Sequence, residues 1–134
     1  EKMHQVFVNI LANALAATQP HGMVSIIVGA RAASPDELDR GRLVTDTMSR
    51  LVVTIEVRDT GCGMPEADVQ KAFEPFFTTK AIGTGTGLGL FLSRETVVAH
   101  GGNLLLESQT GRGTTVTVTL PGLMAESTRV TERV

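Results

Sequence analysis

Glycine stands at four alternate positions from Gly83 to Gly89, where an apolar helical pattern begins. Glycine makes positive φ values accessible and lets a ligand approach the backbone closely. A helix that begins near Leu88 would aim its unpaired N–H groups and the positive end of its dipole at this loop, which suits phosphate. The string alone does not separate a phosphate site from a glycine-rich loop that holds no ligand.

Two common phosphate-binding motifs do not fit this string. A Walker loop ends in Gly-Lys-Ser/Thr, whereas Leu88 follows Gly87 here. A dinucleotide-binding Gly-x-Gly-x-x-Gly follows a buried strand, whereas a threonine-containing segment precedes this string. Other parts of the chain must therefore decide what the glycines do.

Asn9 and Asn13 lie four residues apart within a helical pattern over residues 2–18, so both amides occupy one side of that helix. They lie next to its apolar positions and should border the core. A carboxamide oxygen is a neutral, hard ligand that suits Mg²⁺ already carrying phosphate oxygens and waters. The alternative is a pair of structural asparagines.

Asp59 follows a predicted strand and opens the turn Asp-Thr-Gly-Cys-Gly-Met at 59–64. An ionised carboxylate only accepts hydrogen bonds, so it suits an exocyclic amine such as that of adenine. Gly61 and Gly63 would let a flat base lie against the backbone. The alternative is an ordinary Asp-Gly turn. Cys62 lies in the proposed adenine turn and is expected to be a small side chain near the ligand rather than a redox sensor.

Three of the five phenylalanines fall in one short stretch, at Phe73, Phe76 and Phe77. Aromatic side chains packed in the core would anchor the start of a loop there. Lys80 stands just before the glycines, within reach of a terminal phosphate. The alternative for Lys80 is a solvated side chain.

The order of elements predicts an α+β fold. Helix and strand patterns alternate as α, β-β, α, α, β-β, which favours a two-layer α/β sandwich with helices on one face of a mixed, mostly antiparallel sheet. Residues 24–30 are predicted to form a buried strand, and residues 33–50 a surface insertion. The remaining predicted elements are helices at 66–73 and 88–100 and strands at 51–58, 103–108 and 114–120.

Composition bounds the class of protein. The 134 residues suit one domain over residues 1–121, with a frayed polar tail at 122–134. A net charge of −2 without a basic cluster argues against nucleic acid. The single cysteine fits a reducing, cytoplasmic setting. No apolar run is long enough to insert into a bilayer, although a longer parent protein could be membrane-anchored.

Together these stretches resemble the ATP-binding domain of sensor histidine kinases, in the GHKL superfamily with its Bergerat-type fold. The asparagine pair, the turn at 59–64, residues 73–80 and residues 85–90 match the family's N, G1, F and G2 boxes in order. Residues 111–121 match its last hairpin. The resemblance covers roughly residues 1–121.

The resemblance implies an ATP site. Asn13 would be the Mg²⁺ ligand, supported by Asn9, and Asp59 would bind the adenine amine. Thr115 would share a water with Asp59, and Lys80 would contact the γ-phosphate. Residues 80–86 would form a short lid. The base pocket would be shaped by Gly61, Gly63 and Met64, and the phosphates cradled by Thr84, Gly85, Thr86, Gly87 and Leu88.

The resemblance also bears on the reaction. Related ATPases carry a glutamate that activates water at the position of Asn9, and an amide cannot act as a general base, so transfer is favoured over hydrolysis. The family's usual cation three residues after the metal ligand is Ala16 here. A nucleotide-binding regulatory module without phosphotransfer, or a related ATPase or serine kinase, remains an alternative.

None of the three histidines lies in a two-helix dimerisation pattern; His100 is expected to cap its helix. The phosphoacceptor histidine is therefore expected on a separate dimerisation domain, with a response regulator as an indirect partner. The chain alone is expected not to autophosphorylate.

Overall fold

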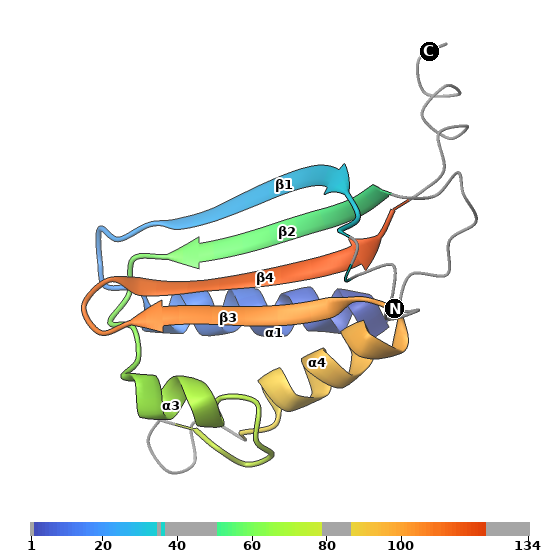
Figure 1. Cartoon of the computed structure of the whole chain (residues 1–134). Helices are drawn as coiled ribbons and strands as arrows, with labels where there is room; N and C mark the ends of the chain where they lie inside the picture. Colours follow the sequence, from blue (N-terminus) through green and yellow to red (C-terminus); the bar gives the residue numbers. More distant parts are fainter. Residues whose placement is uncertain (1, 35, 37–50, 79–86, 123–134) are drawn as a thin grey trace.

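The computed structural model describes residues 2–34, 36, 51–78 and 87–122, which form a four-stranded sheet with helices on one face (Figure 1). The predicted Lys80, Thr84, Gly85 and Thr86, the lid at 80–86 and the tail beyond residue 122 lie outside the described residues. The elements are α1 (Lys2–Ala17), β1 (Val24–Ala32), β2 (Leu51–Asp59), α3 (Glu66–Lys71), α4 (Gly89–Ala99), β3 (Asn103–Gln109) and β4 (Gly113–Pro121).

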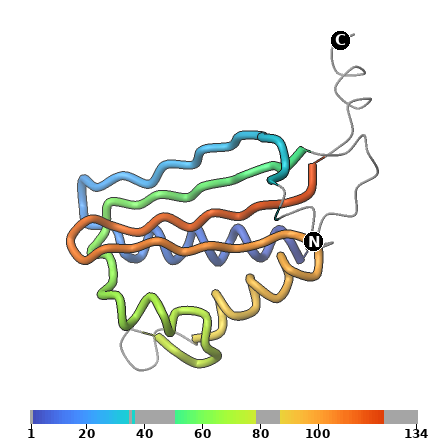
Figure 2. Tube along the Cα trace, in the orientation of Figure 1, coloured from blue at the N-terminus to red at the C-terminus, as the bar shows by residue number. Residues whose placement is uncertain are grey.

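The sheet confirms the predicted α+β class. Its strand order is β1-β2-β4-β3, and every neighbouring pair is antiparallel. The tight β3–β4 turn depends on Gly111 and Gly113, whose φ angles of 81° and 87° suit glycine. Figure 2 shows the tip of this hairpin beside the segment that follows β2. The register places Asp59, the last residue of β2, opposite Thr114.

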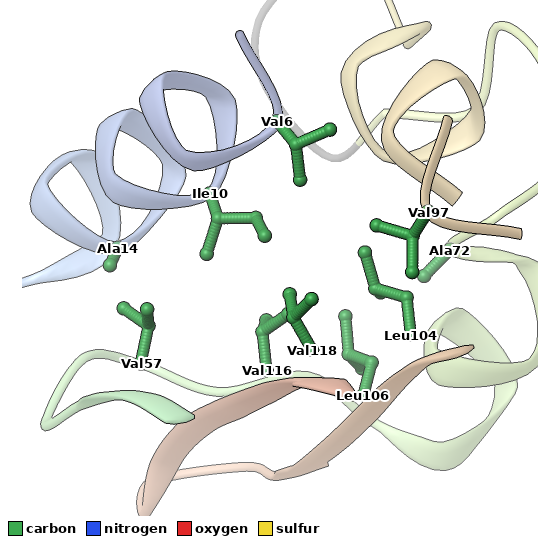
Figure 3. Packing of buried hydrophobic residues seen from close by; sticks show 10 residues of the cluster. All are labelled: Val6, Ile10, Ala14, Val57, Ala72, Val97, Leu104, Leu106, Val116 and Val118. Carbon is green, nitrogen blue, oxygen red and sulfur yellow. The ribbon is translucent and has the colours of Figure 1, made fainter. Parts of the chain in front are cut away.

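α1 forms because its apolar residues recur one turn apart. Val6, Ile10 and Ala14 are its buried positions, and they meet the inner face of the sheet and α4 (Figure 3). α4 contributes Val97, and His100 ends it, with the ring Nδ1 2.8 Å from the Thr96 carbonyl oxygen. The expected capping role of His100 therefore matches its position. No helix among the described residues is long and apolar enough to cross a membrane.

β1 differs from the predicted buried strand. It forms over the expected residues, but it is an edge strand and most of it is exposed. Ile26 lies opposite Val57 on the inner face and is nevertheless 56% exposed. The reason is that α1 packs chiefly against β2, β4 and α4, so the helix layer leaves β1 uncovered. A β-branched run signals a strand without saying which strand lies at the edge.

The inner face of the sheet decides which side chains can form a site. Side chains alternate along a strand, so Thr114, Val116 and Val118 share one face of β4. Val116 and Val118 belong to the core beneath the helices (Figure 3). Thr114, at the start of the strand, therefore lies on the helix side, next to Asp59.

Candidate functional site

A cavity of about 850 Å³ opens between α1, the start of α4 and the ends of β2 and β4. Apolar walls come from residues such as Ile10, Phe77 and Leu90. The structure brings together several residues that were predicted from separate sequence motifs. They are Asn9, Asn13, Asp59, Gly63, Met64 and Gly87.

Asp59 is the acidic group of this cavity, and it is only 9% exposed. Its Oδ1 accepts hydrogen bonds from the Gly61 amide at 2.8 Å and the Thr114 amide at 3.2 Å. Within the described chain no hydrogen bond reaches Oδ2. One carboxylate oxygen thus fixes the side chain, and the other can accept a hydrogen bond from a ligand.

Gly61 makes room for this arrangement. A Cβ there would collide with the Ala17 carbonyl oxygen and would lie 2.9 Å from Asp59 Oδ1. Gly61 is buried and is not among the residues that line the cavity. Gly61 therefore positions the Asp59 side chain through the hydrogen bond from its amide, without facing the cavity itself.

The turn at 59–64 is docked on the β3–β4 hairpin. The Gly111 amide donates to the Cys62 carbonyl at 2.7 Å, and the Met64 amide donates to Ser108 Oγ at 2.8 Å. Gly63 has a φ of 69°, and a Cβ there would collide with the Gln109 carbonyl. The wall that carries Asp59 and Met64 is therefore fixed by segments more than 40 residues away along the chain.

The opposite side of the cavity is formed by α1 and the start of α4. Asn9 and Asn13 are half-buried on α1, and Gln5 Nε2 donates to Asn9 Oδ1 at 3.1 Å. A Cβ on Gly89 would lie 3.9 Å from the Cβ and Cγ of Asn9, so the first turn of α4 packs against this amide.

The first turn of α4 faces the cavity through Gly89 and Leu90. Leu88 is its N-cap residue, and no side chain caps this turn within the described chain. Its backbone N–H groups and dipole favour an anion there. Leu88 itself does not line the cavity, whereas Gly87 does.

The loop after α3 contacts the segment just before α4, where the Phe76 amide donates to the Gly87 carbonyl at 2.7 Å. Gly87 has a φ of 72°, and a Cβ there would collide with the Phe76 backbone. The expected aromatic anchoring is confirmed for Phe73, which packs against the core. Phe77 lines the cavity instead and is not among the residues that pack against the core. Phe76 also departs from the expected anchoring, since its side chain is 73% exposed and its φ is 69°.

Arg94 of α4 adds a second link to this loop. Its guanidinium carbon Cζ lies 4.9 Å from the centroid of the Phe73 ring. A cation over an aromatic face is stabilised by the ring quadrupole. The segment that matches the F box therefore contacts α4 through Phe73 and Arg94, and the residues just before α4 through Phe76 and Gly87.

Thr115 is not brought to the cavity. It lies opposite Arg58 and Glu107, on the face of the sheet away from the helices. Thr114 lines the cavity instead and donates its amide to Asp59. The sequence holds a signal that separates the two threonines: apolar residues alternate at 116, 118 and 120, which places Thr114 on the same face as the buried Val116 and Thr115 on the other.

Comparison with known proteins agrees with this geometry. The family model for the histidine kinase-, DNA gyrase B- and HSP90-like ATPases matches residues 1–123. The chain is 37% identical over 126 residues to the sensor kinase CckA of Brucella abortus, covering 93% of this chain and 13% of that protein. It is 36% identical over 126 residues to the sensor histidine kinase WalK of Bacillus subtilis, covering 90% of this chain and 18% of that protein.

Among solved structures, the nucleotide-free catalytic domain of the histidine kinase ThkA aligns with a TM-score of 0.64 and 30% identity. That alignment covers 90% of this chain and 66% of the ThkA chain. The chain spans less than a fifth of the length of CckA and less than a fifth of the length of WalK. It belongs to the histidine kinase-, DNA gyrase B- and HSP90-like ATPase family, and within it to the ATP-binding catalytic domains of sensor histidine kinases.

Proposed function

We propose that this chain binds Mg·ATP and donates the γ-phosphate to a histidine on a separate domain. The observation that carries the proposal is the buried carboxylate of Asp59. Its Oδ1 is fixed by two backbone amides, and its Oδ2 takes part in no hydrogen bond within the described chain. Asp59 Oδ2 is not among the described polar atoms that are buried without a partner, so this acceptor is open to the cavity and can take a donor from a ligand in place of water.

At the base end, Asp59 Oδ2 accepts a hydrogen bond from the exocyclic amine of adenine. Gly63 and Met64 form the wall against which the base lies, and Gly61 holds the carboxylate. The cavity walls around them are largely apolar, which suits a flat aromatic ring. Recognition of the base thus combines one oriented acceptor with apolar contact.

At the phosphate end, the donor set fits a magnesium ion that arrives with the nucleotide. No cluster of three or more His, Cys, Asp or Glu that could hold a metal occurs among the described residues. Mg²⁺ usually keeps several waters and substrate phosphates and takes few protein ligands. The amide of Asn13 would be one such ligand, supported by Asn9, and the bound ion would neutralise phosphate charge.

The phosphates themselves lie toward the start of α4. The backbone N–H groups and the dipole of the first turn of α4 favour an anion there, next to Gly87. The sequence adds Thr84, Gly85 and Thr86 to this cradle and Lys80 as the contact to the γ-phosphate. We propose Lys80 from its place in the F box, Gly85 and Thr86 from their place in the G2 box, and Thr84 because it directly precedes that box.

Transfer fits the site better than hydrolysis does. Among the described residues that line the cavity, Asp59 is the one carboxylate, and it lies at the end proposed to hold adenine. Asn9 carries an amide, which cannot take a proton from water. In transfer, an imidazole nitrogen forms a bond to the γ-phosphorus as the bond to the β–γ bridging oxygen breaks, and ADP leaves with that oxygen. The imidazole nitrogen attacks through its own lone pair, so transfer does not depend on a residue of this cavity that activates water.

The acceptor histidine comes from elsewhere. His4, His21 and His100 are exposed, and none of them lines the cavity. We propose that the chain is part of a larger, cytoplasm-facing sensor kinase. Its direct partner is a dimerisation and phosphoacceptor domain, and a response regulator receives the phosphate afterwards. Proteins such as CckA and WalK are several times longer than the matched segment, which leaves room for such a domain.

Asp59→Asn tests the base site. The amide still accepts from Gly61 and Thr114 through its oxygen, but it turns an NH₂ group toward the adenine amine. We expect the Kd for Mg·ATP, measured by calorimetry, to rise about 100-fold, since an acceptor is lost and two donors oppose each other. Asp68→Asn on α3, away from the cavity, is the control. Unchanged affinity in Asp59→Asn would rule out the adenine assignment.

Transfer is tested with γ-labelled ATP and a phosphoacceptor domain from a sensor kinase. The chain alone should incorporate no label, and the mixture should yield acid-labile phosphohistidine. Binding without transfer would favour a regulatory nucleotide-binding module. One observation supports that alternative: Ala16 lines the cavity where a phosphate-facing cation is usual in the family. Acid-stable product would point to a serine kinase.

A further inference from the structure

Ser108, near the end of β3, connects three parts of the base end. Its Oγ accepts a hydrogen bond from the Met64 amide at 2.8 Å and donates to the Gly113 carbonyl at 3.1 Å. It also lies 2.8 Å from Thr114 Oγ1. Ser108 does not line the cavity, so it acts on a ligand only through the groups it holds.

The three contacts fix the direction of each hydrogen bond. A serine hydroxyl has one hydrogen and two lone pairs. The Met64 amide can only donate, so it takes one lone pair. The Gly113 carbonyl can only accept, so it takes the hydrogen. The 2.8 Å contact with Thr114 by itself allows either hydroxyl to donate; with the Ser108 hydrogen on the Gly113 carbonyl, the remaining lone pair accepts from Thr114, and the Thr114 hydrogen is directed at Ser108.

This direction determines what Thr114 can offer to a ligand. With its hydrogen engaged, Thr114 Oγ1 has only lone pairs left. Thr114 lines the cavity beside Asp59, with which it is paired across strands β2 and β4. Asp59 Oδ2 is also an acceptor. Apart from the thiol of Cys62, which is a weak donor, the polar side-chain atoms that line this end are then acceptors.

We propose that Ser108 is a positioning residue for base selectivity, because it keeps the Thr114 hydroxyl an acceptor so that the site takes a 6-amino purine and rejects a 6-oxo purine. A 6-amino group can donate a hydrogen bond to each of the two acceptors, Asp59 Oδ2 and Thr114 Oγ1. A 6-oxo oxygen is itself an acceptor, so it would face these oxygens with no hydrogen to share. The inference rests on the proposed ATP site and adds how that site discriminates between bases.

The experiment compares ATP with inosine triphosphate (ITP), which carries a 6-oxo group in place of the 6-amino group. Kd values for both nucleotides are measured by calorimetry in the presence of Mg²⁺. We expect the ITP/ATP ratio of Kd values to fall about five- to tenfold in Ser108→Ala, the effect of one reoriented hydrogen bond. The freed Thr114 hydroxyl can then donate to the 6-oxo oxygen.

A double-mutant cycle separates this role from general weakening. Thr114→Val removes the hydroxyl and keeps the amide bond to Asp59. In that background, Ser108→Ala should change the ratio less than about twofold, because the group it orients is gone. Ser108→Thr keeps a hydroxyl and should retain wild-type selectivity. Ser25→Ala, on the edge strand β1, is the control for loss of a serine hydroxyl elsewhere.

The outcomes distinguish the two proposals. If the wild-type chain does not bind ATP, the proposed function fails. If ATP binds but Ser108→Ala leaves the ratio unchanged, or shifts it equally with and without the Thr114 hydroxyl, only the role of Ser108 is overturned. Should Ser108→Ala not fold, the Thr114→Val variant alone decides, since an unchanged ratio there would equally refute selection by this hydroxyl.

Discussion

The two ends of the cavity are built in different ways. At the base end, the turn at 59–64 and the β3–β4 hairpin are joined by directed hydrogen bonds, including Met64 to Ser108 and Thr114 to Asp59. On the helix side, α1 and α4 meet largely through apolar packing around Ile10 and Val97. The end with Asp59 is thus held by directed hydrogen bonds between segments distant in the chain, whereas the helix side is held mainly by apolar packing.

Gly113→Ala should break the base end most severely. Gly113 has a φ of 87°, and a Cβ there would collide with the Asp59 carbonyl oxygen. Backbone on both sides of this contact cannot yield like a flexible side chain. We expect a loss of about 3 kcal/mol or more in the free energy of unfolding, measured by urea denaturation.

Gly111→Ala is the matched control for that substitution. Its φ of 81° carries the same left-handed strain, but a Cβ there would meet nothing within 4 Å. The loss should be about 1 kcal/mol, the usual cost of this conformation for a residue with a side chain. Equal losses in the two variants would mean that close docking of the hairpin on β2 contributes nothing.

This contrast also explains what the sequence could predict. Asp59 and the glycines beside it form a local pattern, and Asn9 and Asn13 need only a helical repeat, so each of these could be found from short stretches. Their convergence on one cavity came from matching several such stretches to one family. The α+β class followed from the order of the elements.

The rest depended on pairing between distant strands. Thr114 and Thr115 are adjacent and chemically identical, and only the β2–β4 register places the first beside Asp59. Ser108 reaches Met64 across 44 residues, which no local pattern encodes. The exposure of β1 follows from its place at the edge of the sheet. Side-chain alternation predicts faces, but strand order must be known before a face can be called covered.

Asn13→Ala should test the other end of the cavity with a smaller effect. If this amide is a ligand of the magnesium ion, the Kd for ATP in Mg²⁺ should rise about tenfold. With EDTA in place of Mg²⁺, and for adenosine, the variant and the wild type should differ little, because the base end is untouched. Calorimetry in the three conditions provides the measurement.

Asn9→Ala is the companion to that variant. Asn9 Oδ1 already accepts from Gln5 Nε2, so a supporting role predicts a weaker dependence on Mg²⁺ than for Asn13. A larger magnesium-dependent loss in Asn9→Ala than in Asn13→Ala would reverse the assignment of the ligand. If both variants lose the same affinity with and without Mg²⁺, neither Asn9 nor Asn13 is a ligand of the magnesium ion.

The smallest expected effect has the opposite sign and lies on α4. Ser93 is 1% exposed, and its Oγ has no hydrogen-bond partner within the described chain. A buried hydroxyl that loses its water without gaining a partner is destabilising. Ser93→Ala also places the residue with the highest helix propensity in a helix interior. We expect the free energy of unfolding to increase by about 1 kcal/mol.

Ser108→Ala sharpens the comparison because the same chemical change is made at the base end. There the hydroxyl holds three partners, and its removal leaves the Met64 amide unpaired, so we expect a loss of about 1–2 kcal/mol. Thermal melting of both variants gives the two signs directly. Ser93 is buried in a helix and Ser108 is half-buried in a strand, so the difference between the variants combines hydrogen-bond partners with secondary-structure propensity. Two losses of similar size would mean that the Ser93 hydroxyl does have a stabilising partner, because the substitution removes that hydroxyl alone.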